Sequence, residues 1–443
     1  MASIDGAALV AACLRATGAR RVFVAAGHGA DEVEAACASS GLRIVPVLDD
    51  ALAAVLADAD GVLATAPNER PGVALLTGRR LRLSSRPGAV VDAVDVAIED
   101  LPAAIAGWTL GRGRAAIELV LPPNLGAAVD ASLQPLVVQR DERLVRLSAG
   151  LAGMATVLLV GARVVREGAA ADVAGAAERT GASIIATPAA AGLVPLDNPC
   201  WCGVVGVQRD DAVGTGLDEA QLVIAVGIDD DEPGALVPDA AQLVDLEPWH
   251  LAFLGLDWPE PPIGERSPLV DHLATVLAAH RGDDAAPLHP VRAAIDVLDA
   301  IGGEVRIAVD AGSVGVWFAR GLLPVAAGRV VVPMDAVDGF AAAAAVIAAL
   351  DGERVVAVTT PGDPTTAALC DLASAMDLDV VVEQWGDDVP AGDPSRHRAD
   401  LVGALAEGGT HLLGVAVDLA SAAELIEIAG PVDLWVDPTT ITD

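Results

Sequence analysis

The segment VVAVTTPGDPTTAALCDLASAMDLDVVVEQWGDD, residues Val355 to Asp388, holds two apolar runs with a helical stretch between them. The first run, VVAVTT, ends in a turn that contains Gly362 and Asp363, and the second, DVVVEQWG, leads into an acidic loop. Continuous Val-rich runs that alternate with helical sequence are typical of a parallel sheet covered by helices on both faces. The segment therefore predicts a strand–helix–strand unit with a lone aspartate at the end of its first strand.

The same pattern recurs along most of the 443 residues. Apolar runs that end in glycine or polar residues alternate with alanine-rich stretches, as in RRVFVAAG (20–27), ATVLLVGARVV (155–165) and VRIAVDAGS (305–313). Alternation of this kind throughout a chain indicates α/β domains. We therefore expect an α/β protein built from doubly wound parallel sheets.

Two polar or proline-rich connections divide the pattern into three blocks. They are VQRDERLVRLS (138–148) and HRGDDAAPLHP (280–290). A chain of this length suggests about three domains. We expect three domains, at residues 1–145, 146–287 and 288–443.

Composition limits the partners and the chemistry of the chain. A formal net charge of −35 argues against nucleic acid and anionic membrane surfaces, and the longest uncharged apolar run, Phe340–Leu350, is too short to span a bilayer. All 27 basic residues are arginine, which excludes a Schiff-base lysine and a P-loop. Five cysteines, an odd number, suit reduced thiols, and no signal peptide is evident. We expect an acidic cytoplasmic protein.

The three blocks, in their order, resemble the thiamine-diphosphate enzymes of the acetohydroxyacid synthase and 2-oxoacid decarboxylase family. The central block is the closest match, through VLLVGARVVREGAAADVAGAAERTGASIIATPAAAGLVPLDNPCWCGVVG (157–206) and LDEAQLVIAVGIDDDEP (217–233). The N-terminal block contributes DGAALVAACLRATGARRVFVAAGHGADEVEAA (5–36), and the last block VDAGSVGVWFAR (309–320) and DGFAAAAAVIAAL (338–350). The resemblance implies a shortened pyrimidine-binding domain, a central domain and a diphosphate-binding domain.

The resemblance also implies an activity. Its cofactors would be thiamine diphosphate and Mg²⁺, and its substrate a small 2-oxoacid that undergoes decarboxylation or carboligation, as in acetolactate synthase. It implies a homodimer or homotetramer, because the family's cofactor lies between the pyrimidine domain of one chain and the diphosphate domain of another. The alternative is a cofactor-free relative that serves as a structural or regulatory subunit, or that hosts a different reaction in the former cleft.

Two residues of the N-terminal block are candidate catalytic groups. The family's activating glutamate aligns with Asp50, which is one methylene shorter. Capping of the helix that follows is the structural alternative at this place, and Asp49 would serve it well. His28 follows the strand in RRVFVAAG, at a sheet edge where open α/β sheets place ligands, so it is a candidate for acid–base work.

The last block holds the candidate cofactor site. The family's Gly-Asp-Gly motif aligns with Gly362-Asp363-Pro364, where the proline removes an N–H group. Glu383 would bring a further negative charge beside the diphosphate, and the Gly-Pro-Gly loop of the first block has no counterpart. The resemblance implies cofactor-binding positions at Gly312, Ser313, Gly339, Gly362, Asp363 and Gln384, and metal ligands at Asp363, Gln384 and Gly386.

Two charged segments lie outside these motifs. The basic segment GRRLRLSSR (78–86) could hold an anion, or could be a solvated loop paired with nearby acids. The three aspartates at 229–231 are expected to form a solvated acidic loop.

Overall fold

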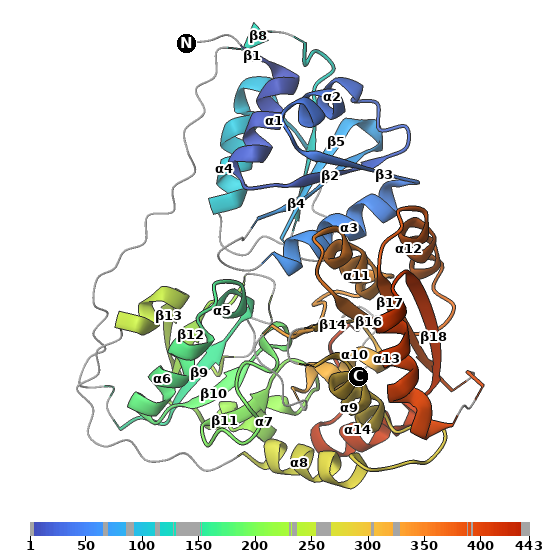
Figure 1. Ribbon diagram of the computed structural model, residues 1–443. Helices are drawn as coiled ribbons and strands as arrows, with labels where there is room; N and C mark the ends of the chain where they lie inside the picture. The colour runs from blue at the N-terminus through green and yellow to red at the C-terminus, as the bar shows by residue number, and fades with distance from the viewer. Residues whose placement is uncertain are drawn as a thin grey trace.

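The computed structural model describes residues 4–64, 70–85, 93–110, 116–126, 128–129, 151, 153–229, 232, 237–253, 267–302, 305–321, 328–387, 389–390 and 393–435. Across these ranges, helices pack around three sheets of six, five and five strands (Figure 1). The expected α/β fold class is confirmed. In the same ranges no helix has the length and apolar character needed to cross a membrane.

The first sheet has the strand order β3-β2-β4-β5-β7-β6. A separate antiparallel pair joins β1 (Ile4–Asp5) to β8 (Ala128–Val129). The elements of the sheet are α1 (Gly6–Ala16), β2 (Arg21–Ala25), α2 (Asp31–Ser39), β3 (Arg43–Val47), α3 (Asp50–Leu63), β4 (Gly72–Leu76), η1 (Thr77–Arg79), β5 (Arg80–Ser84), β6 (Val94–Asp95), η2 (Ile98–Asp100), α4 (Leu101–Leu110) and β7 (Ala116–Val120).

One strand of this sheet departs from the parallel pattern. Strand β5 is antiparallel to both β4 and β7. It follows β4 through the three-residue turn η1, in which Gly78 and Arg79 both have positive φ (68° and 61°). A connection this short can only join antiparallel strands, because a parallel crossover needs a dozen or more residues. The hairpin stands where the resemblance would place the family's Gly-Pro-Gly loop and the helix that follows it.

The second sheet, with order β11-β10-β9-β12-β13, is parallel throughout. Its elements are β9 (Thr156–Val160), α5 (Ala162–Arg166), α6 (Ala170–Thr180), β10 (Ser183–Ala186), η4 (Pro188–Ala190), β11 (Trp201–Val204), α7 (Asp211–Thr215), η5 (Leu217–Glu219), β12 (Leu222–Val226), β13 (Gln242–Leu246), η7 (Pro248–Phe253) and α8 (Pro268–His280).

The third sheet, with order β15-β14-β16-β17-β18, is also parallel throughout. The expected boundary near residue 145 lies outside the described residues, and the one near 287 falls between α8 and α9. The elements are α9 (Pro290–Ile301), β14 (Arg306–Val309), α10 (Ser313–Ala319), β15 (Val330–Val331), α11 (Phe340–Leu350), β16 (Val355–Thr359), α12 (Pro364–Ala375), β17 (Val380–Gly386), η8 (Pro394–Arg396), α13 (His397–Glu407), β18 (Thr410–Ala416), η9 (Leu419–Ala422) and α14 (Ala423–Ala429).

Helices α3 and α11 join the first and third sheets within one chain (Figure 1). Nine of the eleven residues of α11 are buried, and most of them are alanines, so the backbone of α3 can approach closely. Phe23, Leu56 and Ala344 belong to one continuous apolar core at this contact. Ion pairs from the buried Arg21 and Arg70 to the more exposed Asp351 reinforce it. Helices α3 and α11, which each cover one face of their own sheet, therefore also cover each other without a second chain.

Candidate functional site

Two helices begin side by side at the carboxyl end of the third sheet. A Cβ atom on Gly339, which precedes α11, would lie 2.6 Å from Cγ2 of Thr365 in the first turn of α12. Gly339 also has a φ of +75°, a conformation that favours glycine. The first turns of two helices thus meet, and each carries backbone N–H groups that have no partner within the helix and a partial positive charge. This place favours oxygen ligands and anions.

Two aspartates already accept hydrogen bonds from these N–H groups. Asp363 accepts from the backbone N–H of Thr365 at 2.9 Å, and from the N–H and hydroxyl of Thr366 at 2.8 and 2.6 Å. Asp310, at the end of β14, accepts from the N–H of Ala341 at 2.8 Å and from the hydroxyl of Thr359. Asp363 therefore caps α12, and Asp310 caps α11.

Asp310 was not among the site residues expected from the sequence. Burial raises the pKa of this carboxyl to about 6, the hydrogen bonds from Ala341 and Thr359 oppose the rise, and the nearby charges of Asp363 and Asp338 add to it. The available signal was a carboxylate directly after the apolar run VRIAV, at the same sheet edge as Asp363. Three acids so close together repel one another, and a bound cation would relieve that repulsion.

The side chains of β17 point to opposite faces of the sheet. Val380 and Val382 pack in the core that contains α11 and α12, whereas Val381 and Trp385 pack in the other main core. Since strand side chains alternate, Gln384 lies on the α12 face, beside Thr359 in register. The sheet thus places Gln384 on the same face as the start of α12, as the magnesium hypothesis requires.

Glu383 does not lie beside the start of α12, which corrects the expectation that it would crowd a diphosphate there. It is buried on the opposite face, where its carboxylate accepts from the indole N–H of Trp385 at 2.9 Å. Its other oxygen lies 3.0 Å from Nε2 of His397. Alternation along the strand, which fixes Gln384 on one face, fixes Glu383 on the other.

The glycines and serine expected at the cofactor site differ in their surroundings. Gly312 and Gly362 have positive φ (95° and 91°), and a Cβ on either would meet no atom within 4 Å. Ser313, the first residue of α10, is exposed. The carbonyl oxygen of Gly386 accepts long hydrogen bonds, 3.4 Å each, from Val389 and Val417. Open backbone is therefore available at Gly312 and Gly362, and less so at Gly386.

Asp50 is held by the hairpin. Its carboxylate accepts from the N–H and hydroxyl of Thr77 at 2.7 and 2.6 Å, and from the guanidinium of Arg80 at 2.8 Å. Asp49 caps α3 by accepting from the N–H of Leu52 at 2.9 Å. The capping role thus belongs to Asp49, and the Asp50 carboxylate faces the turn between β4 and β5.

His28 is buried at the start of α2. Its Nδ1 accepts from the N–H of Ala30 at 3.0 Å, and its Nε2 lies 3.0 Å from Oε2 of Glu34 and 3.6 Å from Oδ1 of Asp31. The hydrogen bond at Nδ1 places the proton of the neutral ring on Nε2, directed at Glu34. Both ring nitrogens are thus engaged within this segment.

Residues 78–85 of the basic segment lie in the turn η1, in strand β5 and just after it, whereas Arg86 lies outside the described residues. Arg79 pairs with Glu32, and Arg80 and Arg82 both pair with Glu118. The pairing with acids is confirmed, although Arg80 and Arg82 belong to strand β5 and not to a loop.

The expectation of a solvated loop is wrong at Asp229. This residue is buried and forms a two-point ion pair with Arg166 at 2.6 and 3.0 Å. Buried Glu232 accepts from the N–H groups of Ala162 and Asp229, at 3.0 and 2.6 Å. Asp230 and Asp231 lie outside the described residues. Glu232 thus secures the start of α5, and Asp229 secures its end.

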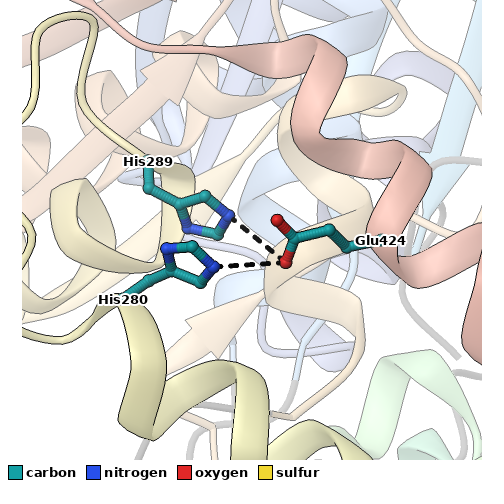
Figure 2. A group of neighbouring side chains, drawn as sticks. All are labelled: His280, His289 and Glu424. Atoms are coloured by element: carbon teal, nitrogen blue, oxygen red, sulfur yellow. Dashed lines mark ion pairs between the residues drawn. The ribbon is translucent and has the colours of Figure 1, made fainter.

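A second group of potential ligands lies between α8, α9 and α14. In Figure 2 the imidazoles of His280 and His289 both point at the carboxylate of Glu424, with Nε2–Oε2 distances of 3.3 and 3.8 Å. The two rings are stacked, 3.6 Å apart and 8° from parallel. Nδ1 of His289 accepts from the N–H of Val291 at 3.2 Å, so the proton of the neutral ring sits on Nε2. The proton on Nε2 of His289 occupies the lone pair that a metal ion would need, so this geometry does not favour a metal site.

Comparison with known proteins bears on the second sheet. Residues 153–250 match the family model for the central domain of thiamine pyrophosphate enzymes, thiamine pyrophosphate being another name for thiamine diphosphate. The matched segment runs from β9 to η7 and includes all five strands of that sheet. No curated protein matches the chain significantly. The second sheet is thus similar to the central domain of thiamine pyrophosphate enzymes.

Proposed function

We propose that the chain is a divergent thiamine-diphosphate-dependent enzyme that acts on a 2-oxoacid by decarboxylation or carboligation, in the manner of acetolactate synthase. The observation that carries the proposal is the meeting of the α11 and α12 N-termini at the carboxyl end of the third sheet. Parallel α/β sheets bind ligands at this edge. The match of the second sheet to a central domain of this enzyme family supports the same conclusion.

The donor set at this place fits a magnesium ion. Asp363 and Gln384 offer carboxylate and amide oxygens, the hard ligands that Mg²⁺ prefers when it bridges to phosphates. Asp363 accepts three hydrogen bonds, which leaves capacity for one more partner. The open backbone at Gly312 and Gly362, with Ser313 alongside, would receive the diphosphate, and the carbonyl of Gly386 could complete the metal shell.

When bound, thiamine diphosphate supplies a carbon nucleophile and an electron sink for carbonyl substrates. The chain itself would supply a carboxylate to receive a hydrogen bond from the pyrimidine ring, and we assign this role to Asp50. Thr77 and Arg80 orient that carboxylate. His28, engaged by Glu34, remains a weaker candidate for acid–base work.

A second function is favoured by a specific observation. Asp310 and Asp363 accept the N–H groups at the starts of α11 and α12, which are the donors that diphosphate oxygens would use. A protein that fills its own anion site has less need of a phosphorylated cofactor. The chain could then be a cofactor-free relative that serves as a structural or regulatory subunit, or that hosts another reaction in this cleft.

Calorimetric titration of the full chain with thiamine diphosphate and Mg²⁺ separates the two functions. The enzyme hypothesis predicts saturable heat that depends on Mg²⁺ and is weakened at least about tenfold, ~1.4 kcal/mol, by Asp363→Asn. The matched control is Asp393→Asn, which alters a capping aspartate at η8 in the same sheet unit. Silence at millimolar cofactor would support the cofactor-free relative. Pyruvate turnover, measured as release of CO₂, then tests the substrate class.

A further inference from the structure

A large cationic cavity lies where the three sheet units meet. Its volume is about 680 Å³, and its lining includes residues from the first, second and third units. Five of the chain's 27 basic residues contribute to it: Arg20, Arg70, Arg306, Arg329 and Arg354. The only acids in the described lining are Asp351 and Glu353, so the side chains sum to +3 (five positive, two negative). This is an unusual place in a chain with a net charge of −35.

The cavity is separate from the candidate cofactor site. Arg306 begins β14, and Arg329 and Arg354 precede β15 and β16, so these three arginines lie at the amino ends of the third sheet's strands. Asp363 and Gln384 lie at the carboxyl ends. The cavity also borders the last turns of α3 and α11, whereas the cofactor site lies at the first turn of α11.

Two of the arginines are held by partners within the fold. Arg70 contacts Asp60 at 2.8 Å and Asp351 at 3.1 Å. Arg306 donates to the carbonyl of Leu63 at 3.1 Å and to Glu353 at 2.7 Å. These contacts fix both guanidinium groups in the wall of the cavity.

Two of the other arginines are less compensated. Arg20 and Arg354 are exposed, and within the described part of the chain neither side chain has an acceptor partner. Long-range repulsion by a strongly acidic protein keeps anions away in general. A local excess of arginine is therefore needed wherever such a protein is to hold an anion.

We propose that this cavity binds a small molecule that carries two or more phosphate groups. Guanidinium groups donate paired N–H bonds that match phosphate oxygens, and several can engage one diphosphate at once. The lining charge of +3 balances a diphosphate better than a single carboxylate. The volume is in the range of small-molecule sites. Contact with all three units means that such a ligand would stabilise their relative placement.

Titration calorimetry with inorganic pyrophosphate, at low ionic strength and with EDTA present, tests the proposal. We expect saturable binding by the wild type and at least about tenfold weaker binding, ~1.4 kcal/mol, by the double variant Arg20→Gln/Arg354→Gln. The matched control is Arg396→Gln/Arg398→Gln, which removes the same charge from exposed positions around the start of α13. Thermal melts check that both double variants fold.

Four results would overturn the proposal. One is silence of the wild type at millimolar pyrophosphate, and another is equal weakening in the two double variants, which would indicate only a general charge effect. The third is equally tight binding of succinate, which would indicate a carboxylate site. Asp363→Asn should leave pyrophosphate binding unchanged in EDTA. If it abolished binding, the ligand would be occupying the candidate cofactor site instead.

Discussion

Nε2 of His397 lies 3.0 Å from Oε1 of Glu383, and both side chains are buried. Nδ1 of the same ring lies 3.3 Å from Oδ2 of Asp296 on α9. Burial alone would lower the pKa of His397, but its hydrogen bonds to Asp296 and Glu383 raise that pKa to about 9. The ring is therefore a buried imidazolium that joins β17, α9 and α13.

Replacement of His397 by glutamine should destabilise the fold by roughly 3 kcal/mol at pH 6, because it leaves the buried Glu383 carboxylate without a cation. The folded-state pKa is about 9 and the ordinary value is 6.5. The stabilisation is thus fully present below pH 6.5 and is lost as pH rises through about 9. Urea unfolding of both proteins at pH 6 and pH 9.5 measures it. His411→Gln, at a half-buried ring bonded to the Gly408 carbonyl, is the control. A stability gap that did not narrow at high pH would contradict this account.

Gly339→Ala should lower the free energy of unfolding by about 2–4 kcal/mol, since it adds strain at positive φ and a steric clash. The new Cβ would lie 2.6 Å from Thr365. Gly352→Ala is a close control, because Gly352 has a φ of +72° but open space around its Cβ position. We expect it to cost about 1–2 kcal/mol. Equal losses would show that the contact between α11 and α12 contributes little.

Asp363→Ala should cost about 1–2 kcal/mol without Mg²⁺, because three hydrogen bonds at the start of α12 are lost. Asp363→Asn should lower the free energy of unfolding by less, since asparagine also caps helices and carries no charge that repels Asp310. The same change should move the pKa of Asp310 from about 6 towards its ordinary value. Thermal and urea unfolding in EDTA rank the two variants. A stabilising Asp363→Ala would mean that repulsion outweighs capping.

Acid should weaken the fold through His289. Burial, and then the neighbouring His280, lower the pKa of His289 to about 4 from its ordinary 6.5. The stabilisation that the neutral His289 ring contributes is fully present above pH 6.5, and it should therefore be lost as pH drops towards 4. His289→Asn keeps an acceptor for the N–H of Val291 and removes this titration. Its unfolding free energy should depend less steeply on pH over that interval, and identical slopes would contradict the assignment.

The homodimer or homotetramer that the resemblance implies remains a prediction. The resemblance implies a dimer because the family's cofactor lies between two chains. Here, however, α3 and α11 cover each other within one chain. A dimer must then use another surface or exchange this contact between chains. Light scattering at micromolar concentration should give at least twice the 44.5 kDa chain mass. A monomer mass would show that the contact within one chain suffices.

Local sequence patterns predicted the α/β class and the position of Asp363. Both depend on local chemistry: Val-rich runs form buried strands, and the glycine turn after VVAVTT ends the first of them just before Asp363. Asp49 was also correctly assigned as a cap, because its role needs only the next three residues.

What the sequence did not reveal depends on contacts across space. The antiparallel strand β5 was missed because its arginines obscure an apolar alternation that becomes clear only beside β7. Glu383 was expected beside the diphosphate, but it lies on the opposite face of the sheet because side chains alternate along a strand. The high pKa of Asp310 arises from burial under α11 and from the charge of Asp363, which comes from a separate part of the chain.

The burial of α11 also bears on how the molecule comes apart. Its alanines pack against α3 on one side and against β14 and β16 of its own sheet on the other. Neither the first nor the third sheet can therefore separate from the other without exposing α11 to water. Backbone amides of α11 should exchange hydrogen only in the largest opening events. The first and third sheets would then melt as one cooperative unit, although the whole second sheet lies between them in the chain.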